Sequence, residues 1–138
     1  MKTSELTGAE LDLWVARAEG MDNVPGEWGN ALINDLGRLS VARTRWDGAK
    51  YFEPHRKWSD AGPIIEREKL MIQPLLVGGD WYGEWRSVGL SWEGRTHADT
   101  TGPTPLIAAM RAYVGSKFGE EVGAARIAGQ EKKENGNG

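Results

Sequence analysis

Two helical patterns, one near each end, constrain the fold of this 138-residue chain most strongly. The first predicts a helix over residues 7–19, because apolar residues recur at spacings of three and four. These residues are Leu11, Trp14, Val15 and Ala18. Thr7 and Glu10 have the spacing of a capping box, and Gly20 is a natural stop. Since Trp14 lies on the apolar face, we expect its ring in the core.

The second pattern predicts a helix over residues 105–118. Thr104 suits the N-cap, Pro105 suits the first helical position, and Gly119 suits the end. The apolar residues that recur along this helix are Ile107, Met110, Val114 and Phe118. The two helices therefore bracket the remaining elements.

Weaker patterns lie between the helices. Residues 31–33 are apolar inside a Gly/Asn/Asp-rich loop and indicate one helical turn. Alternation predicts antiparallel strands, and Gly78-Gly79 predicts a tight turn. The predicted elements are short strands at 39–41 and 51–52, a helical turn at 63–67, a strand from about 68, a strand over 81–92 and a polar loop over 93–102.

These elements predict an α+β fold with two helices packed on a small antiparallel sheet. The predicted single domain spans residues 1–122. The polar tail over 123–138 has too few apolar residues to pack, and we expect it to be disordered.

Composition excludes several classes of protein. The absence of cysteine excludes disulfides, thiol nucleophiles and cysteine zinc sites. The net charge of −3 argues against a nucleic-acid binder, and no apolar run is long enough to span a membrane. No phosphate-loop, dinucleotide, zinc-protease or serine-hydrolase motif is present. We therefore expect no cofactor, no metal and no catalytic residue, and a cytoplasmic setting.

Seven tryptophans and one basic segment point instead to binding. Residues 38–57 hold six Lys or Arg against two acids, with Trp46, Tyr51 and Trp58 within or beside them. Guanidinium groups bind phosphate and aromatic rings stack on bases, so this composition suits a nucleotide. The alternative is a rim of long basic side chains around buried rings.

Trp81 and Trp85 lie on the opposite strand parity to Trp92, which places them toward solvent or a partner. Exposed tryptophans are typical of interfaces, so we expect a homo-oligomer.

Acidic residues and histidines offer further candidates for a metal site or a pair of carboxylates. His55 and His97 could share a metal with Asp60 or Asp99. Glu66 and Glu68 could present paired carboxylates on one strand face, although a solvated face beside Arg67 and Lys69 is the simpler interpretation.

Several blocks resemble the NinX-type family of small tailed-phage proteins. They are 2–8 (Lys-Thr-Ser-Glu-Leu-Thr-Gly), 13–20, 58–68 (Trp-Ser-Asp-Ala-Gly-Pro-Ile-Ile-Glu-Arg-Glu), 102–114 (Gly-Pro-Thr-Pro-Leu-Ile-Ala-Ala-Met-Arg-Ala-Tyr-Val) and 117–122. The resemblance implies a phage accessory protein in the host bacterial cytoplasm and provides no catalytic residue. Some phage accessory proteins sequester nucleotide signals of host immunity, and this class suits a small tryptophan-rich binder.

The leading hypothesis is a non-enzymatic protein that sequesters an anionic, nucleotide-like small molecule. Its candidate ligand-binding residues are Arg43, Arg45, Trp46, Tyr51, Arg56, Trp58, Asp60, Arg67, Trp81, Trp85 and Thr104. The alternatives are a protein–protein inhibitor of a host factor and a nucleotide-signal hydrolase acting through Glu66, Glu68 or His55.

Overall fold

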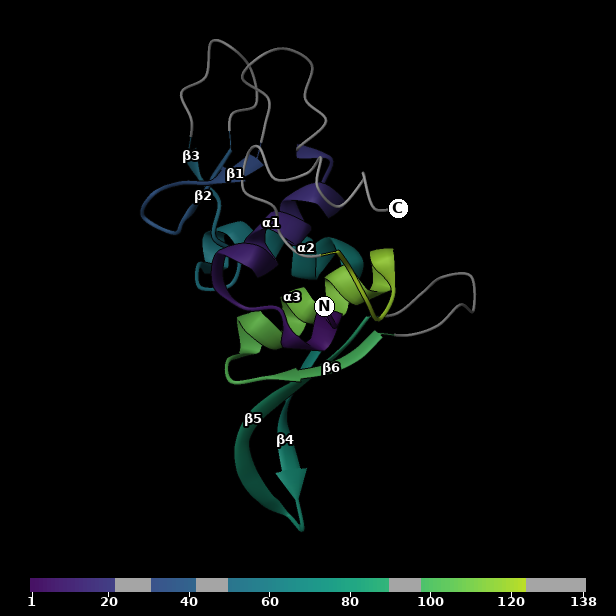
Figure 1. The fold of residues 1–138 in the computed structure, drawn as a ribbon. Helices are drawn as coiled ribbons and strands as arrows, with labels where there is room; N and C mark the ends of the chain where they lie inside the picture. Colours follow the sequence, from purple (N-terminus) through teal and green to yellow (C-terminus); the bar gives the residue numbers. More distant parts are fainter. Residues whose placement is uncertain (22–30, 42–49, 90–97, 124–138) are drawn as a thin grey trace.

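Four layers stack in the computed structural model, which describes residues 1–21, 31–41, 50–89 and 98–123 (Figure 1). A small antiparallel sheet of β1, β2 and β3 lies against α1, and α1 and α2 lie against α3. The helix α3 in turn covers the second antiparallel sheet, in which the strand order is β4-β5-β6. The predicted α+β class is therefore confirmed, with three helices among the described residues in place of two.

The chain passes through these elements in a simple order. A 3-10 turn η1 precedes the first helix, and both sheets are built from sequential strands. The bounds are η1 Thr3–Glu5, α1 Gly8–Ala18, β1 Ala31–Ile33, β2 Leu39–Val41, β3 Lys50–Tyr51, α2 Trp58–Glu68, β4 Met71–Val77, β5 Asp80–Gly89, β6 Ala98–Gly102 and α3 Pro105–Phe118.

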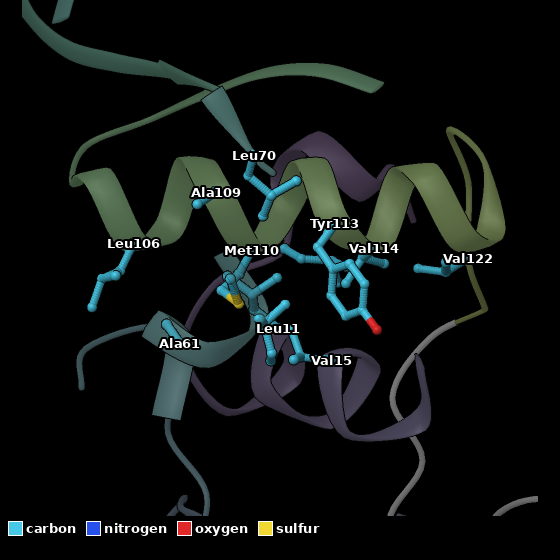
Figure 2. Packing of buried hydrophobic residues seen from close by; sticks show 12 residues of the cluster. Leu11, Val15, Ala61, Leu70, Leu106, Ala109, Met110, Tyr113, Val114 and Val122 are labelled. Atoms are coloured by element: carbon cyan, nitrogen blue, oxygen red, sulfur yellow. The ribbon is translucent and has the colours of Figure 1, made fainter. Parts of the chain in front are cut away.

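The first hydrophobic cluster lies between the three helices. Leu11 and Val15 of α1 meet Ile64 of α2 and Met110 and Tyr113 of α3, with other apolar side chains around them (Figure 2). This core includes the predicted Leu11, Val15, Met110 and Val114, whereas Phe118 of the predicted stripe is 42% exposed at the end of α3.

The second cluster lies on the other side of α1. Leu13 and Ala16 pack against Leu39 and Val41 of β2. The helix α1 is thus covered on two sides, and Asp12, between Leu11 and Leu13, is fully buried. The predicted core residue Trp14 is half-buried at the edge of the first cluster, where its ring meets Phe118 edge-on with centroids 5.3 Å apart.

Both predicted long helices are confirmed, with one difference at a cap. The Thr104 hydroxyl accepts a hydrogen bond from Ile107 N at 3.1 Å, as an N-cap should. Thr7 has extended N-cap dihedrals, but its side chain makes no capping hydrogen bond, so the predicted capping box does not form. Its backbone carbonyl accepts from Leu11 N instead.

The helical turn predicted at 63–67 is a full helix, α2, which begins five residues earlier at Trp58. Pro63 lies inside it, where proline removes a helical donor. Burial of Ala61 and Ile64, one turn apart, holds this helix against α3 and offsets that loss. Lys69 then ends α2 in the left-handed region (φ 54°), so the next strand begins at Met71 rather than 68.

Two predictions of irregular structure are wrong. Residues 31–33 form β1, because Asn34 Oδ1 accepts from Leu36 N and Arg38 N and closes a tight hairpin to β2. Residues 98–102 of the predicted polar loop form β6, which pairs with β5 from Gly89↔Ala98 to Trp85↔Gly102.

The hairpin predicted at Gly78-Gly79 is confirmed, with both glycines at positive φ. Among the described residues, no helix is long and apolar enough to cross a membrane.

Candidate functional site

The predicted site residues fall into three places in the structure. Tyr51, Arg56, Trp58 and Asp60 lie together between β3 and the first turn of α2. Arg67 lies at the far end of α2. Trp81, Trp85 and Thr104 belong to β5 and the start of α3. Arg43, Arg45 and Trp46 lie outside the described residues, as do Trp28, Trp92 and His97.

A buried carboxylate, Glu53, gathers three cations at the first of these places. Its Oε1 lies 2.7 Å from Arg38 Nη2, 2.9 Å from Arg56 Nη2 and 3.4 Å from Lys57 Nζ. Hydrogen bonds from Arg38 and then Arg56 hold the pKa of Glu53 well below its usual range. We call these four residues the Glu53 cluster, and it carries three positive charges against one negative charge.

The chain folds into a tight turn that creates this cluster. The Glu53 carbonyl accepts from Arg56 N and Lys57 N, which turns both side chains back toward the Glu53 carboxylate. Asp60 Oδ2 accepts from Glu53 N at 2.9 Å. Asp60, predicted to orient a ligand, therefore fixes the backbone that precedes α2.

One aromatic ring contacts the Glu53 cluster, and a second belongs to the residue that follows Lys57 in the chain. The Arg38 guanidinium stacks 3.5 Å from the centroid of Tyr51, whose hydroxyl accepts from Asn34 Nδ2 at 3.1 Å. Trp58, the first residue of α2, is 57% exposed. The stacked Tyr51 ring and the exposed Trp58 ring are the aromatic faces that the described part of this region offers.

Near the cluster, the buried Asp12 pairs with the partly exposed His55. Asp12 Oδ2 lies 2.5 Å from His55 Nδ1, and Asp12 Oδ1 accepts from His55 N at 2.9 Å. Burial raises the pKa of Asp12 to about 6, against the lowering effect of His55, and the nearby Glu53 charge adds to the rise. The imidazole is therefore held by Nδ1, and within the described residues Nε2 has no partner.

Arg67, predicted to meet phosphate, instead ties the three helices together. It contacts Glu19 at 2.6 Å and Glu68 at 2.8 Å, and its Nη2 donates to the Tyr113 hydroxyl. Tyr113 donates to Glu19, and burial raises the pKa of that phenol. Glu68 also lies 3.7 Å from Lys117, so Glu66 and Glu68, which belong to α2, form no strand-face pair.

The tryptophans of β5 lie on the opposite side of α3 from the Glu53 cluster (Figure 1). Trp81 and Trp85 meet edge-on with ring centroids 6.1 Å apart, and Trp81 Nε1 donates to the Glu84 carbonyl. The Thr104 hydroxyl already accepts the N-cap hydrogen bond of α3. The structure thus separates these residues from Tyr51, Arg56 and Trp58.

Sequence reasoning did not select Asp12, Arg38 or Glu53. Asp12 gave one signal, because it interrupts the apolar residues of a helix, but its partner is 43 positions away. The sequence offers His55 as a metal ligand or as a residue of a hydrolase, and no group of three or more His, Asp or Glu in the described residues could hold a metal.

A hollow of about 660 Å³ lies elsewhere, between η1, the start of β6 and the end of α3. Its polar lining includes Thr3, Asp99, Thr100 and Glu120. None of the predicted ligand-binding residues lines it, although Asp99, a candidate metal ligand in the sequence, does.

Comparison with known proteins supports the resemblance noted in the sequence. No curated protein matches the chain. The profile of the family described as "Bacteriophage P22, NinX" matches residues 2–117, which span all the helices and strands except the last residue of α3. The protein therefore belongs to the NinX family of phage proteins.

Proposed function

We propose that this phage protein binds an anionic, base-containing small molecule in the cytoplasm of its host and withholds it without chemical change. The observation that carries the proposal is the Glu53 cluster in contact with Tyr51, with the exposed Trp58 next to Lys57 in the chain. Phosphate would meet the cations and the base would meet an aromatic face, which are the two contacts that a nucleotide needs.

The geometry of the two arginines supports this proposal. Arg38 and Arg56 each use Nε and Nη2 on Glu53, with distances of 2.7 to 3.3 Å. Within the described residues, Nη1 of Arg56 makes no hydrogen bond, whereas the Arg38 guanidinium also stacks on the Tyr51 ring. Because Glu53 already holds the side chains in place, a ligand would lose less affinity to side-chain ordering.

The composition of the segment 42–49 also supports it. This segment carries Arg43, Arg45 and Trp46, and it connects two residues, Val41 and Lys50, that are register partners in the small sheet. Both ends of the segment therefore adjoin the small sheet, which includes Tyr51.

Isothermal titration calorimetry tests the proposal, with ADP-ribose and a cyclic dinucleotide as probes and ribose as the uncharged control. Arg56→Gln and Trp58→Ser should each weaken binding about 10-fold or more, as expected for a charged hydrogen bond or a stacked base. Arg86→Gln is the matched control, because Arg86 is a partly exposed arginine paired with Asp99 on the distant sheet. Absence of binding to both probes, or equal loss with Arg86→Gln, would contradict the proposal.

A hydrolase is the second candidate, and the Asp12–His55 pair favours it. A buried carboxylate on Nδ1 leaves Nε2 able to take a proton from water. The water oxygen would form a bond to phosphorus, the bond to the leaving oxygen would break, and that oxygen would take up a proton. Ligand recovered intact after denaturation supports sequestration. Turnover that His55→Asn abolishes would instead establish the hydrolase.

A further inference from the structure

We propose that Asp12 is a positioning residue of the ligand site, and that anion binding at this site is coupled to proton uptake by the Asp12–His55 pair. Through His55, Asp12 holds the turn of residues 53–57, which we call the cation turn because it carries Arg56 and Lys57. The inference rests on the proposed function, because it states how the same site is held in place and regulated.

Two aspartates from two helices hold the backbone of the cation turn. Asp60 of α2 accepts from Glu53 N at 2.9 Å, and Asp12 of α1 accepts from His55 N at 2.9 Å. The side chain of Pro54, between these two anchor points, is fully buried. The cation turn therefore has a fixed orientation relative to both helices before a ligand arrives.

Asp12 is a rigid anchor because α1 is packed on two sides. Asp12 is fully buried between Leu11, which belongs to the cluster with α2 and α3, and Leu13, which belongs to the cluster with β2. Both of its carboxylate oxygens contact His55, one at the backbone nitrogen and one at Nδ1. A displaced cation turn would leave this buried carboxylate without its partners, which is costly.

The cation turn determines where two of the three cations lie. The Glu53 carbonyl accepts from Arg56 N and Lys57 N, and the Glu53 carboxylate contacts both of these side chains. Because His55 precedes Arg56, its contact with Asp12 fixes the backbone immediately before this guanidinium. Without that anchor, the ligand itself would have to order Arg56 and Lys57, at a cost in affinity.

The charge of Asp12 makes this anchor sensitive to the ligand. Burial raises the pKa of Asp12 to about 6, against the lowering effect of His55, and the charge of Glu53 adds to the rise. A charge at the Glu53 cluster therefore acts on Asp12. By thermodynamic linkage, an anion bound there raises the pKa of Asp12 further, and protonation of Asp12 strengthens the binding of the anion.

The anchor survives this protonation. When Asp12 is ionised, the imidazole of His55 donates its Nδ1 hydrogen to Oδ2. When Asp12 is protonated, Oδ2 donates to Nδ1 and the imidazole carries its hydrogen on Nε2. The pair thus gains one proton and loses one negative charge, while Oδ1 still accepts from His55 N.

The other charged groups around the pair belong to the same two anchors. Glu53 is the carboxylate that acts on Asp12, and Arg38 and Arg56 keep it ionised because they hold its pKa well below its usual range. Lys57 contacts the same Glu53 carboxylate, and Asp60 faces the cation turn from α2. Ionisation of Glu53 is therefore complete in the range where the pair gains its proton.

Isothermal titration calorimetry of the full chain at pH 5.5, 6.5 and 8 tests the inference. ADP-ribose is the probe, because its two phosphates keep their charge over this range. The wild type should bind about threefold more tightly at pH 5.5 than at pH 8, as expected for one unit charge acting across a partly solvated site. Titrations in buffers of different ionisation enthalpy should show proton uptake on binding.

Two substitutions of Asp12 separate its charge from its contacts. An amide keeps both contacts, so Asp12→Asn should bind ADP-ribose at pH 8 at least as tightly as the wild type and show a flatter pH profile. Asp12→Ala removes both contacts and should weaken binding about tenfold at every pH, the cost of ordering two long side chains. Asp99→Asn is the matched control, since Asp99 is a partly exposed carboxylate held by Arg86 on the sheet beyond α3, and it should leave the profile unchanged. A flat wild-type profile, or a folded Asp12→Ala that binds like the wild type, would overturn the inference.

A ligand-free measurement distinguishes failure of this inference from failure of the proposed function. In the ¹H–¹⁵N NMR spectrum, the backbone amide and Nε–H signals of Arg56 should shift as the pH passes through about 6 in the wild type. They should stay constant in Asp12→Asn. Absence of ADP-ribose binding at every pH would contradict the proposed function, and the inference would then depend on these signals. Arg56 signals that do not shift, or that shift equally in Asp12→Asn, would overturn it.

Discussion

Asp12 and Glu53 are both buried carboxylates, and their surroundings shift their pKa values in opposite directions. Burial raises the pKa of Asp12 to about 6, whereas Arg38 and Arg56 hold that of Glu53 well below its usual value. The folded protein therefore holds the Asp12 proton more tightly than the unfolded chain does, and the Glu53 proton less tightly. Each shift makes the stability of the fold depend on pH in its own window.

The Asp12 shift predicts a stability gain in mild acid. As the pH rises from about 4 to above 6, ionisation of Asp12 should lower the free energy of unfolding by up to about 3 kcal/mol. Asp12→Asn should remove this dependence, so the variant should gain stability relative to the wild type over that range. Urea denaturation at pH 4, 5, 6 and 7 measures both curves. Parallel curves would show that Asp12 does not titrate in this window.

Glu53→Gln tests the opposite case, a carboxyl group whose pKa is lowered in the folded protein. A lowered pKa stabilises the fold above the unfolded value of about 4.5, and this stability is lost as the pH falls toward the folded value. The glutamine variant should therefore lose stability at neutral pH and show a flatter acid limb below pH 4.5.

Residue contacts could be predicted from the sequence only where they are local. Arg56 and Tyr51 both belong to one basic segment, and Arg38 and Glu53 connect them. Asp12 reaches His55 only because α1 is covered on two sides, by α3 and by the small sheet. The single apolar stripe of this helix predicts one packing partner and does not predict the small sheet on the other side. Arg67 has the same charge as Arg56, but tertiary contacts with α1 and α3 determine its role.

At the scale of elements, small residues let α3 lie very close to the β4-β5-β6 sheet. A Cβ atom built on Gly102 would lie 2.8 Å from Ala108 N, and one on Gly89 would lie 3.4 Å from the Ala112 carbonyl oxygen. Thr100, on the same face as Gly102, donates its hydroxyl hydrogen to the Ala108 carbonyl at 2.9 Å. These small and polar side chains explain why β6 has no apolar alternation and was predicted as a loop.

This close approach predicts a large effect from one methyl group. Gly102→Ala should lower the free energy of unfolding by about 1–3 kcal/mol, because helix backbone must move to admit the methyl. Gly62→Ala is the control, since Gly62 lies inside α2 with no atom within 4 Å of an added Cβ. That change should instead stabilise the protein by about 0.5–1 kcal/mol through helix propensity. Equal effects in chemical denaturation would contradict the close packing.

At the scale of the whole molecule, strong periodicity made the fold class predictable. Helices α1 and α3 follow from apolar stripes with clear ends, and the β4–β5 hairpin follows from Gly78-Gly79. The sequence predicts too short a helix in place of α2, because Pro63 is typical of a helix start. The packing of α2 on α3 explains why the helix begins before Pro63. The separation of Trp58 from Trp81 by α3 has no local signal at all.

The position of α1 between two hydrophobic clusters predicts that the whole molecule unfolds as one unit. Leu11 lies in the cluster with α2 and α3, Leu13 lies in the cluster with β2, and Phe52 packs against both clusters. Leu11→Ala and Leu13→Ala should therefore each lower the free energy of unfolding by about 2–5 kcal/mol. Unfolding should remain a single transition, and neither variant should unfold one cluster alone. Far-ultraviolet circular dichroism and tryptophan fluorescence should give coincident urea curves for the wild type and both variants. Leu36→Ala, at an exposed turn, should change stability by less than about 0.5 kcal/mol. Leu13→Ala could instead give two urea transitions, a first one of small amplitude and a second one at the wild-type midpoint. The small sheet would then unfold separately from the three helices.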